Sequence, residues 1–160
     1  MTRPVIDHRG PEFGEMVLGL FDGLRGVFGD AHHVFVFPSS ASGCWEAALV
    51  NTLSPGDRVL LYDNGFFAAK WGAIAGRLGL DVEIVPGDWH HPVDPDAIRA
   101  RLAADSGGVI RAVLVVHNET STGVASDIGA VRASLDAVGH SALLMVDAVS
   151  SLGAMPFTQA

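Results

Sequence analysis

The chain has 160 residues, 49% of them hydrophobic, and a formal net charge of −8 at pH 7. This negative charge, with no lysine or arginine cluster to offset it, argues against a nucleic-acid-binding protein. No apolar stretch approaches the ~18 residues of a membrane span, and Cys44, the only cysteine, cannot form an internal disulfide, which is typical of a reducing compartment. We therefore expect a cytoplasmic protein that acts on small molecules, not on nucleic acid or membranes.

Apolar runs alternate along the chain with segments of helical spacing. Pro11, which a helix tolerates in its first turn, begins the first of these segments. The predicted elements are a helix at 11–29, a strand at 34–37, a helix from a small-residue turn at 38–43 to about 52, a strand at 58–62, a helix at 66–79, a strand at 82–85, a helix at 94–104, a strand at 112–116, a helix at 128–138 and a strand at 142–146. This order predicts a doubly wound, mostly parallel sheet in a three-layer α/β/α arrangement.

Two of these strands end abruptly in polar residues. Residues 112–116 run into His-Asn-Glu-Thr-Ser-Thr-Gly at 117–123, and residues 142–146 run into Asp147. With a helix between them they form a β-α-β unit, so both polar ends lie side by side at the carboxyl edge of the sheet, where open α/β sheets bind ligands. The turn at 38–43 opens another helix, whose N-terminus can bind an anion.

Each feature also has a plain structural interpretation. The serines at 39–42 could simply cap a helix, and Asp147 could cap a turn after its strand. A nicotinamide-binding fold is excluded because no two glycines have the spacing Gly-x-Gly, and a serine hydrolase because Gly-x-Ser-x-Gly is absent. His90 and His91 lack a third ligand at a suitable spacing, so we expect a solvated loop and no metal site.

Taken together, Ser-Ala-Ser at 40–42, His-Asn-Glu-Thr-Ser-Thr-Gly at 117–123 and Val-Asp-Ala-Val-Ser-Ser at 146–151 resemble class V aminotransferases of the pyridoxal-phosphate (PLP) fold type I superfamily. The nearest are the serine–glyoxylate and alanine–glyoxylate aminotransferases. The resemblance extends from about Asp7 to Phe157. It implies that residues 1–160 are part of a PLP-binding large domain that is truncated. The family's Schiff-base lysine comes further along than Ala160, so the C-terminal part is absent.

The resemblance assigns the cofactor phosphate to the loop of Ser40, Ala41 and Ser42, although relatives often have glycine in place of Ala41. It places an aromatic side chain against the pyridine ring, and Phe67 aligns best with that position. A stacked aromatic ring contributes about 0.5–1.5 kcal/mol beyond its burial. We expect the neighbouring Phe66 to be a core residue.

The resemblance makes Asp147 the catalytic residue, because a carboxylate at the pyridine nitrogen keeps it protonated and able to accept electrons. An opposite charge at ~4–6 Å shifts a pKa by about 1–3 units. Thr120 is expected to donate to the phenolic oxygen, with Glu119 and His117 shaping the turn. Val149 is expected against the other face of the ring.

These assignments imply a transaminase that moves an amino group from serine or alanine to glyoxylate or another 2-oxo acid, as a homodimer. Lys70, the only lysine in the chain, matches no catalytic position of the family, and we expect it on the surface, away from the strand ends. The alternative is a catalytically inactive piece that binds PLP or a partner subunit without the covalent lysine.

Overall fold

The computed structural model describes residues 5–29 and 31–157, and the chain forms two compact units. One comprises residues 37–151, and the other residues 1–36 with 152–160. In the smaller unit, helix α1 (Pro11–Val27) confirms the predicted helix, with Pro11 in its first turn and Arg25 in its last. None of the residues of α1, all of which are described, is buried. The described residues contain no helix with the length and apolar character that a membrane crossing requires.

The predicted strand at 34–37 is wrong, because these residues form no strand. The side chains of Phe35 and Val36 are 76% and 64% exposed. An apolar run becomes a strand only where a neighbouring strand takes up its backbone hydrogen bonds, and periodicity alone cannot show whether that neighbour is present.

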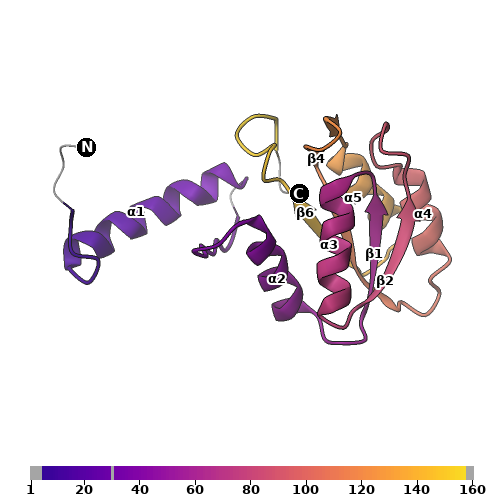
Figure 1. The fold of residues 1–160 in the computed structure, drawn as a ribbon, viewed down its shortest axis with the longest axis horizontal. Coiled ribbons are helices and arrows are strands. Elements are labelled where there is room, and N and C mark those ends of the chain that lie inside the picture. Colours follow the sequence, from indigo (N-terminus) through magenta and orange to yellow (C-terminus); the bar gives the residue numbers. More distant parts are fainter. Residues whose placement is uncertain (1–4, 30, 158–160) are drawn as a thin grey trace. The chain divides into compact units, whose positions relative to one another are not determined.

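The larger unit is built on a parallel sheet of four strands in the order β2-β1-β3-β6 (Figure 1). These strands are β1 (Arg58–Asp63), β2 (Asp81–Pro86), β3 (Ile110–Val116) and β6 (Leu143–Asp147). The predicted strands in this region are confirmed with small shifts at their ends. Strand β3 lies between two neighbours and is buried along nearly its whole length, which explains its continuous apolar sequence.

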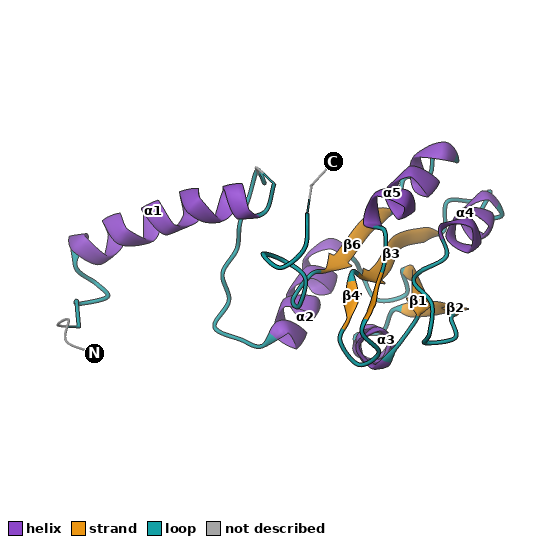
Figure 2. Cartoon of the chain, turned by 90° about the horizontal axis from the view of Figure 1, so that it is seen from above, coloured by secondary structure: helices purple, strands orange, loops and turns teal. Residues whose placement is uncertain are grey.

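Helices cover both faces of this sheet, as Figure 2 shows. They are α2 (Ala41–Thr52), α3 (Phe66–Arg77), α4 (Pro95–Ala103) and α5 (Ile128–Ala137). Alternate residues of β1 point to opposite faces. Val59 packs with Trp71 of α3 on one side, and Leu60 packs with Ile98 of α4 on the other. The two core clusters confirm the three-layer arrangement.

A short hairpin that the sequence did not predict follows β3. Its strands are β4 (Asn118–Glu119) and β5 (Val124–Ala125), which pair antiparallel. The hairpin turn contains Gly123 with a φ of 76°, a left-handed conformation that favours glycine. The polar residues after β3 are therefore held in an ordered turn at the carboxyl edge of the sheet.

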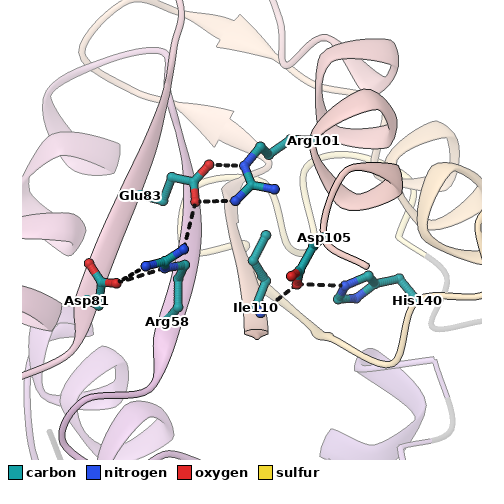
Figure 3. A network of polar contacts seen from close by, with 7 residues as sticks. All are labelled: Arg58, Asp81, Glu83, Arg101, Asp105, Ile110 and His140. Atoms are coloured by element: carbon teal, nitrogen blue, oxygen red, sulfur yellow. Dashed lines mark hydrogen bonds and ion pairs between the residues drawn. The ribbon is translucent and has the colours of Figure 1, made fainter. Parts of the chain in front are cut away.

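Ion pairs tie the amino ends of the strands together, at the edge opposite that turn (Figure 3). Arg58 begins β1 and pairs with Asp81, the first residue of β2, at 2.7 Å. The guanidinium of Arg101 on α4 forms a two-pronged pair with Glu83, and Arg58 lies 3.9 Å from the same carboxylate. These contacts link β1, β2 and α4 at the end of the sheet opposite the turn after β3.

A second contact at the amino edge involves the buried side chains of Asp105 and His140 (Figure 3). The Asp105 carboxylate accepts the Ile110 N–H at 2.7 Å and lies 3.2 Å from His140 Nε2. The backbone N–H of Ala142 donates to His140 Nδ1, so Nε2 is the ring nitrogen that donates to Asp105. The hydrogen bond from Ile110 is the main cause that lowers the pKa of Asp105.

Candidate functional site

A cavity of about 210 Å³ lies at the carboxyl edge of the sheet, within the larger unit. Its lining comes from the start of α2, the start of α3, the turn after β3 and the end of β6. All the predicted site residues line it, namely Ser40, Ala41, Ser42, Phe67, Thr120, Asp147 and Val149. The structure therefore brings together residues from four separate stretches of sequence, and their contact with a cofactor stays a prediction.

Asp147 is the last residue of β6 and is buried, with 9% of its surface exposed. One carboxylate oxygen, Oδ2, accepts the indole N–H of Trp45 at 2.9 Å, and the other, Oδ1, accepts the backbone N–H of Val149 at 2.8 Å. A carboxylate has about four acceptor positions, so two remain for a donor in the cavity. Asp147 is thus an oriented acceptor, as well as a residue that ends a strand.

The start of α2 presents backbone donors to the same cavity. Ser40 is the residue before the first helical turn, and its side chain makes no capping hydrogen bond. The first amides of a helix have no partner within the helix and attract negative charge. This end of the cavity can therefore bind an anion such as a phosphate. Glycine is needed at position 43 in this turn, because a Cβ there would lie 1.9 Å from the Oγ of Ser39.

Thr120 lies in the turn after β3 and is held by a small network of polar groups. Its hydroxyl donates to Ser150 Oγ at 2.9 Å, and that hydroxyl donates to the backbone oxygen of Asn118 at 3.0 Å. The Asn118 side chain donates back to Ser150 Oγ at 2.9 Å. The sequence pattern alone assigns no role to Asn118 and Ser150, although each lies in one of the two polar motifs and both line the cavity.

Glu119 connects this turn to the start of α3. Its fully buried carboxylate accepts the N–H groups of Phe67 and Ala68 through Oε2, and the N–H and hydroxyl of Ser121 through Oε1. A Cβ at Gly65 would lie 2.2 Å from Glu119 Cγ, so glycine is needed for this close approach. Glu119 therefore fixes Phe67 relative to Thr120, which agrees with its predicted role in shaping the turn.

Two expectations for α3 are corrected. Phe66, expected in the core, is 54% exposed, because the buried face of α3 is formed by residues such as Ala68 and Trp71. Lys70 is exposed, as predicted, but it lines the cavity and is not remote from the strand ends. It lies one turn after Phe67, so both side chains are on the same side of the helix.

The residues in the described ranges form no group of three or more histidine, cysteine, aspartate or glutamate side chains that could hold a metal ion. The loop after β2 contains exposed His90 and His91. Their backbone N–H groups both donate to Asp88 Oδ1, and the His91 ring lies against Oδ2. These contacts lower the pKa of Asp88 to about 2, and the His90 hydrogen bond has the largest effect.

Comparison with known proteins finds the same family as the sequence motifs. Residues 23–159 match the family described as aminotransferase class V. The chain is 50% identical, over 96% of its length, to an L-aspartate–glyoxylate aminotransferase of Paracoccus denitrificans, and 49% identical, over 94%, to a serine–glyoxylate aminotransferase of Methylorubrum extorquens. It covers 39% and 38% of those two proteins.

A solved structure shares the fold over nearly the whole chain. The alanine–glyoxylate aminotransferase of a Nostoc species matches 97% of this chain with a TM-score of 0.86 and 27% identity, and 40% of that protein is covered. The chain thus spans about two-fifths of the length of the relatives that it matches. The match over residues 23–159 shows that the chain belongs to the class V aminotransferases, which are PLP-dependent enzymes.

Proposed function

We propose that this chain forms the PLP-binding part of a transaminase that moves an amino group from serine or alanine to glyoxylate or another 2-oxo acid. One observation carries the proposal: the cavity has an uncapped helix N-terminus and a buried, oriented carboxylate among its walls. The partial positive charge of the helix N-terminus and the negative charge of the carboxylate are complementary to a ligand with an anionic phosphate and a cationic ring nitrogen.

In this proposal the amides at the start of α2 bind the phosphate, together with the hydroxyls of Ser40 and Ser42. Phe67 and Val149 line the cavity and enclose the two faces of the ring. Thr120 can turn its hydroxyl from Ser150 toward the phenolic oxygen, because the Ser150 oxygen keeps its bonds with Asn118.

Asp147 holds the proton on the ring nitrogen. A negative charge at ~4–6 Å raises the pKa of a cation by about 1–3 units, and the nearly complete burial of Asp147 reduces screening by water. PLP, when bound, supplies an electron sink for the amino-acid substrate. The part of Asp147 is to keep that sink positively charged.

We further propose that the active protein is a homodimer. Complete pockets for small molecules have volumes of about 300–1,000 Å³, whereas this cavity measures about 210 Å³. Substrate contacts therefore come from residues outside this cavity, and a second copy of the protein is one source of them. The related proteins are named for aspartate and for serine as amino donors, so the donor has to be measured.

Titration of the chain with PLP, followed by absorbance, tests the proposal. We expect saturable binding that is weakened about tenfold or more by Ser42→Glu, which adds a negative charge at the phosphate end of the cavity. Ala48→Glu adds the same charge at an exposed position later in α2 and is the matched control. Equal affinities for the two variants, or no binding by the unmodified chain, would contradict the proposal.

Borohydride reduction and an activity assay then separate a working transaminase from an inactive binding piece. Cofactor that is fixed covalently by borohydride, with amino transfer from serine, alanine or aspartate to glyoxylate, supports the enzyme. Reversible binding without amino transfer supports the inactive alternative. Lys70→Met shows whether a covalent bond uses the lysine that lines the cavity.

A further inference from the structure

Trp45 makes a contact that neither the sequence motifs nor the family assignment explains. It lies on α2, one turn after the proposed phosphate loop, and only 5% of its surface is exposed. Its indole N–H donates to Asp147 Oδ2 at 2.9 Å, between residues 102 positions apart in the sequence. An indole has one polar hydrogen and no acceptor, so this bond uses its entire hydrogen-bonding capacity.

The indole is held firmly in this orientation. Its ring stacks on Trp71 of α3, with centroids 5.5 Å apart and an angle of 13° between the planes. The amino group of Lys70 lies 5.9 Å from the centroid of the Trp45 ring, within reach of a cation–π interaction. Turning the indole away from Asp147 would break both contacts and the hydrogen bond together.

The bond limits how the Asp147 carboxylate can turn. Trp45 holds one oxygen and the Val149 N–H holds the other, so rotation about the carboxyl bond would lose both donors. A hydrogen bond to a carboxylate is about twice as strong as one between neutral groups. Trp45 thereby orients the Asp147 carboxylate.

We propose that Trp45 is a positioning residue that aims the Asp147 carboxylate at the ring nitrogen of the cofactor. This inference rests on the proposed function. Because α2 carries both the phosphate loop and Trp45, this single helix sets the separation between the anion-binding end of the cavity and its carboxylate. The fit for a phosphate and a cationic nitrogen on one ligand therefore depends on the Trp45 hydrogen bond.

The stack of two indoles provides a matched pair of variants. Trp45→Phe removes the donor to Asp147 and keeps an aromatic ring on Trp71. Trp71→Phe makes the same change in the same stack, but the buried Trp71 indole nitrogen has no hydrogen-bond partner among the described residues. Both variants replace an indole of the same stack by a smaller ring. The difference between them therefore reports the contacts that Trp45 makes and Trp71 does not, which are the hydrogen bond to Asp147 and the contact with Lys70.

The first measurement needs no cofactor. In a ¹H–¹⁵N spectrum of the chain, the indole resonance of Trp45 should move when Asp147→Asn removes the charge on its acceptor. The Trp71 indole resonance should move much less. Loss of one resonance in each phenylalanine variant assigns the signals. A Trp45 resonance that does not respond to Asp147→Asn would overturn the inference, whether or not PLP binds.

The second measurement is PLP affinity and the absorbance of bound PLP as a function of pH. We expect Trp45→Phe to raise the PLP dissociation constant about tenfold, within the range for losing a bond to a charged group, and to move the pH profile of the bound cofactor. Trp71→Phe should change the dissociation constant less than threefold and leave the profile in place. Equal effects of the two variants would overturn the inference, whereas failure of the unmodified chain to bind PLP would overturn the proposed function.

Discussion

Replacing Glu119 by alanine should destabilise the larger unit strongly. The buried carboxylate accepts three backbone N–H groups, those of Phe67, Ala68 and Ser121, in addition to the Ser121 hydroxyl. A buried donor left without a partner costs about 1–3 kcal/mol. Three such donors sum to about 3–9 kcal/mol. Because Ser121 is exposed and Phe67 half-buried, water can replace part of these bonds, so we take the lower half of this range and expect a loss of about 3–6 kcal/mol. That is a large share of the ~5–15 kcal/mol that stabilises a typical domain.

Urea denaturation followed by circular dichroism measures this loss as a change in the free energy of unfolding. Glu46→Ala, at an exposed glutamate of α2, is the control and should change stability by no more than about 0.5 kcal/mol. The Glu119→Ala variant should also bind PLP more weakly, since Phe67 loses one of its fixed contacts. A loss of stability below about 1 kcal/mol would refute the account of Glu119 as the link between α3 and the turn after β3.

Three further predictions follow from other contacts. In the active enzyme, Asp147→Asn should leave PLP bound but slow amino transfer about a hundredfold or more. Losing a few kcal/mol of transition-state stabilisation lowers the rate by about two powers of ten. Near-normal turnover would show that Asp147 only caps the turn after its strand. Lys70 is the one cationic side chain in the described lining of the cavity. Lys70→Met should therefore weaken the binding of PLP about two- to fivefold, the effect of an exposed charge, and leave the binding of phosphate-free pyridoxal unchanged. Equal effects on both ligands would rule out a contact between Lys70 and the phosphate. The pKa of Asp105 is lowered in the fold, mainly by the Ile110 N–H, so its contribution to stability is present above its unfolded pKa of about 4 and is lost as the pH falls through the folded value. Acid unfolding curves should therefore be less steep for Asp105→Asn than for the unmodified chain, and identical curves would contradict this linkage.

The parallel sheet was predictable because its strands are continuous apolar runs separated by helices of ordinary length. The grouping of the candidate site residues around one cavity was predictable for a related reason. Residues such as Thr120 and Asp147 come directly after buried strands, and parallel strands bring their carboxyl ends to one edge. The place of each residue at the end of a strand therefore predicts most of the residues that line the cavity.

Other features depend on contacts that a linear pattern cannot reveal. The bond from Trp45 to Asp147 joins a helix to a strand end 102 residues away, and an indole on an apolar helix face is normally a core residue. The segment at 34–37 has the composition of a strand but no strand beside it in the described structure. Phe66 is exposed because the buried face of α3 is formed by residues such as Ala68 and Trp71, and hydrophobicity alone does not show this.

A crystal structure of the protein with PLP would show directly where the cofactor binds. The phosphate should lie at the start of α2, within about 3 Å of the first backbone N–H groups, and the ring nitrogen should lie within about 3 Å of an oxygen of Asp147. Phe67 should cover one face of the ring. Cofactor bound elsewhere on the protein, or with its ring nitrogen turned away from Asp147, would contradict the account.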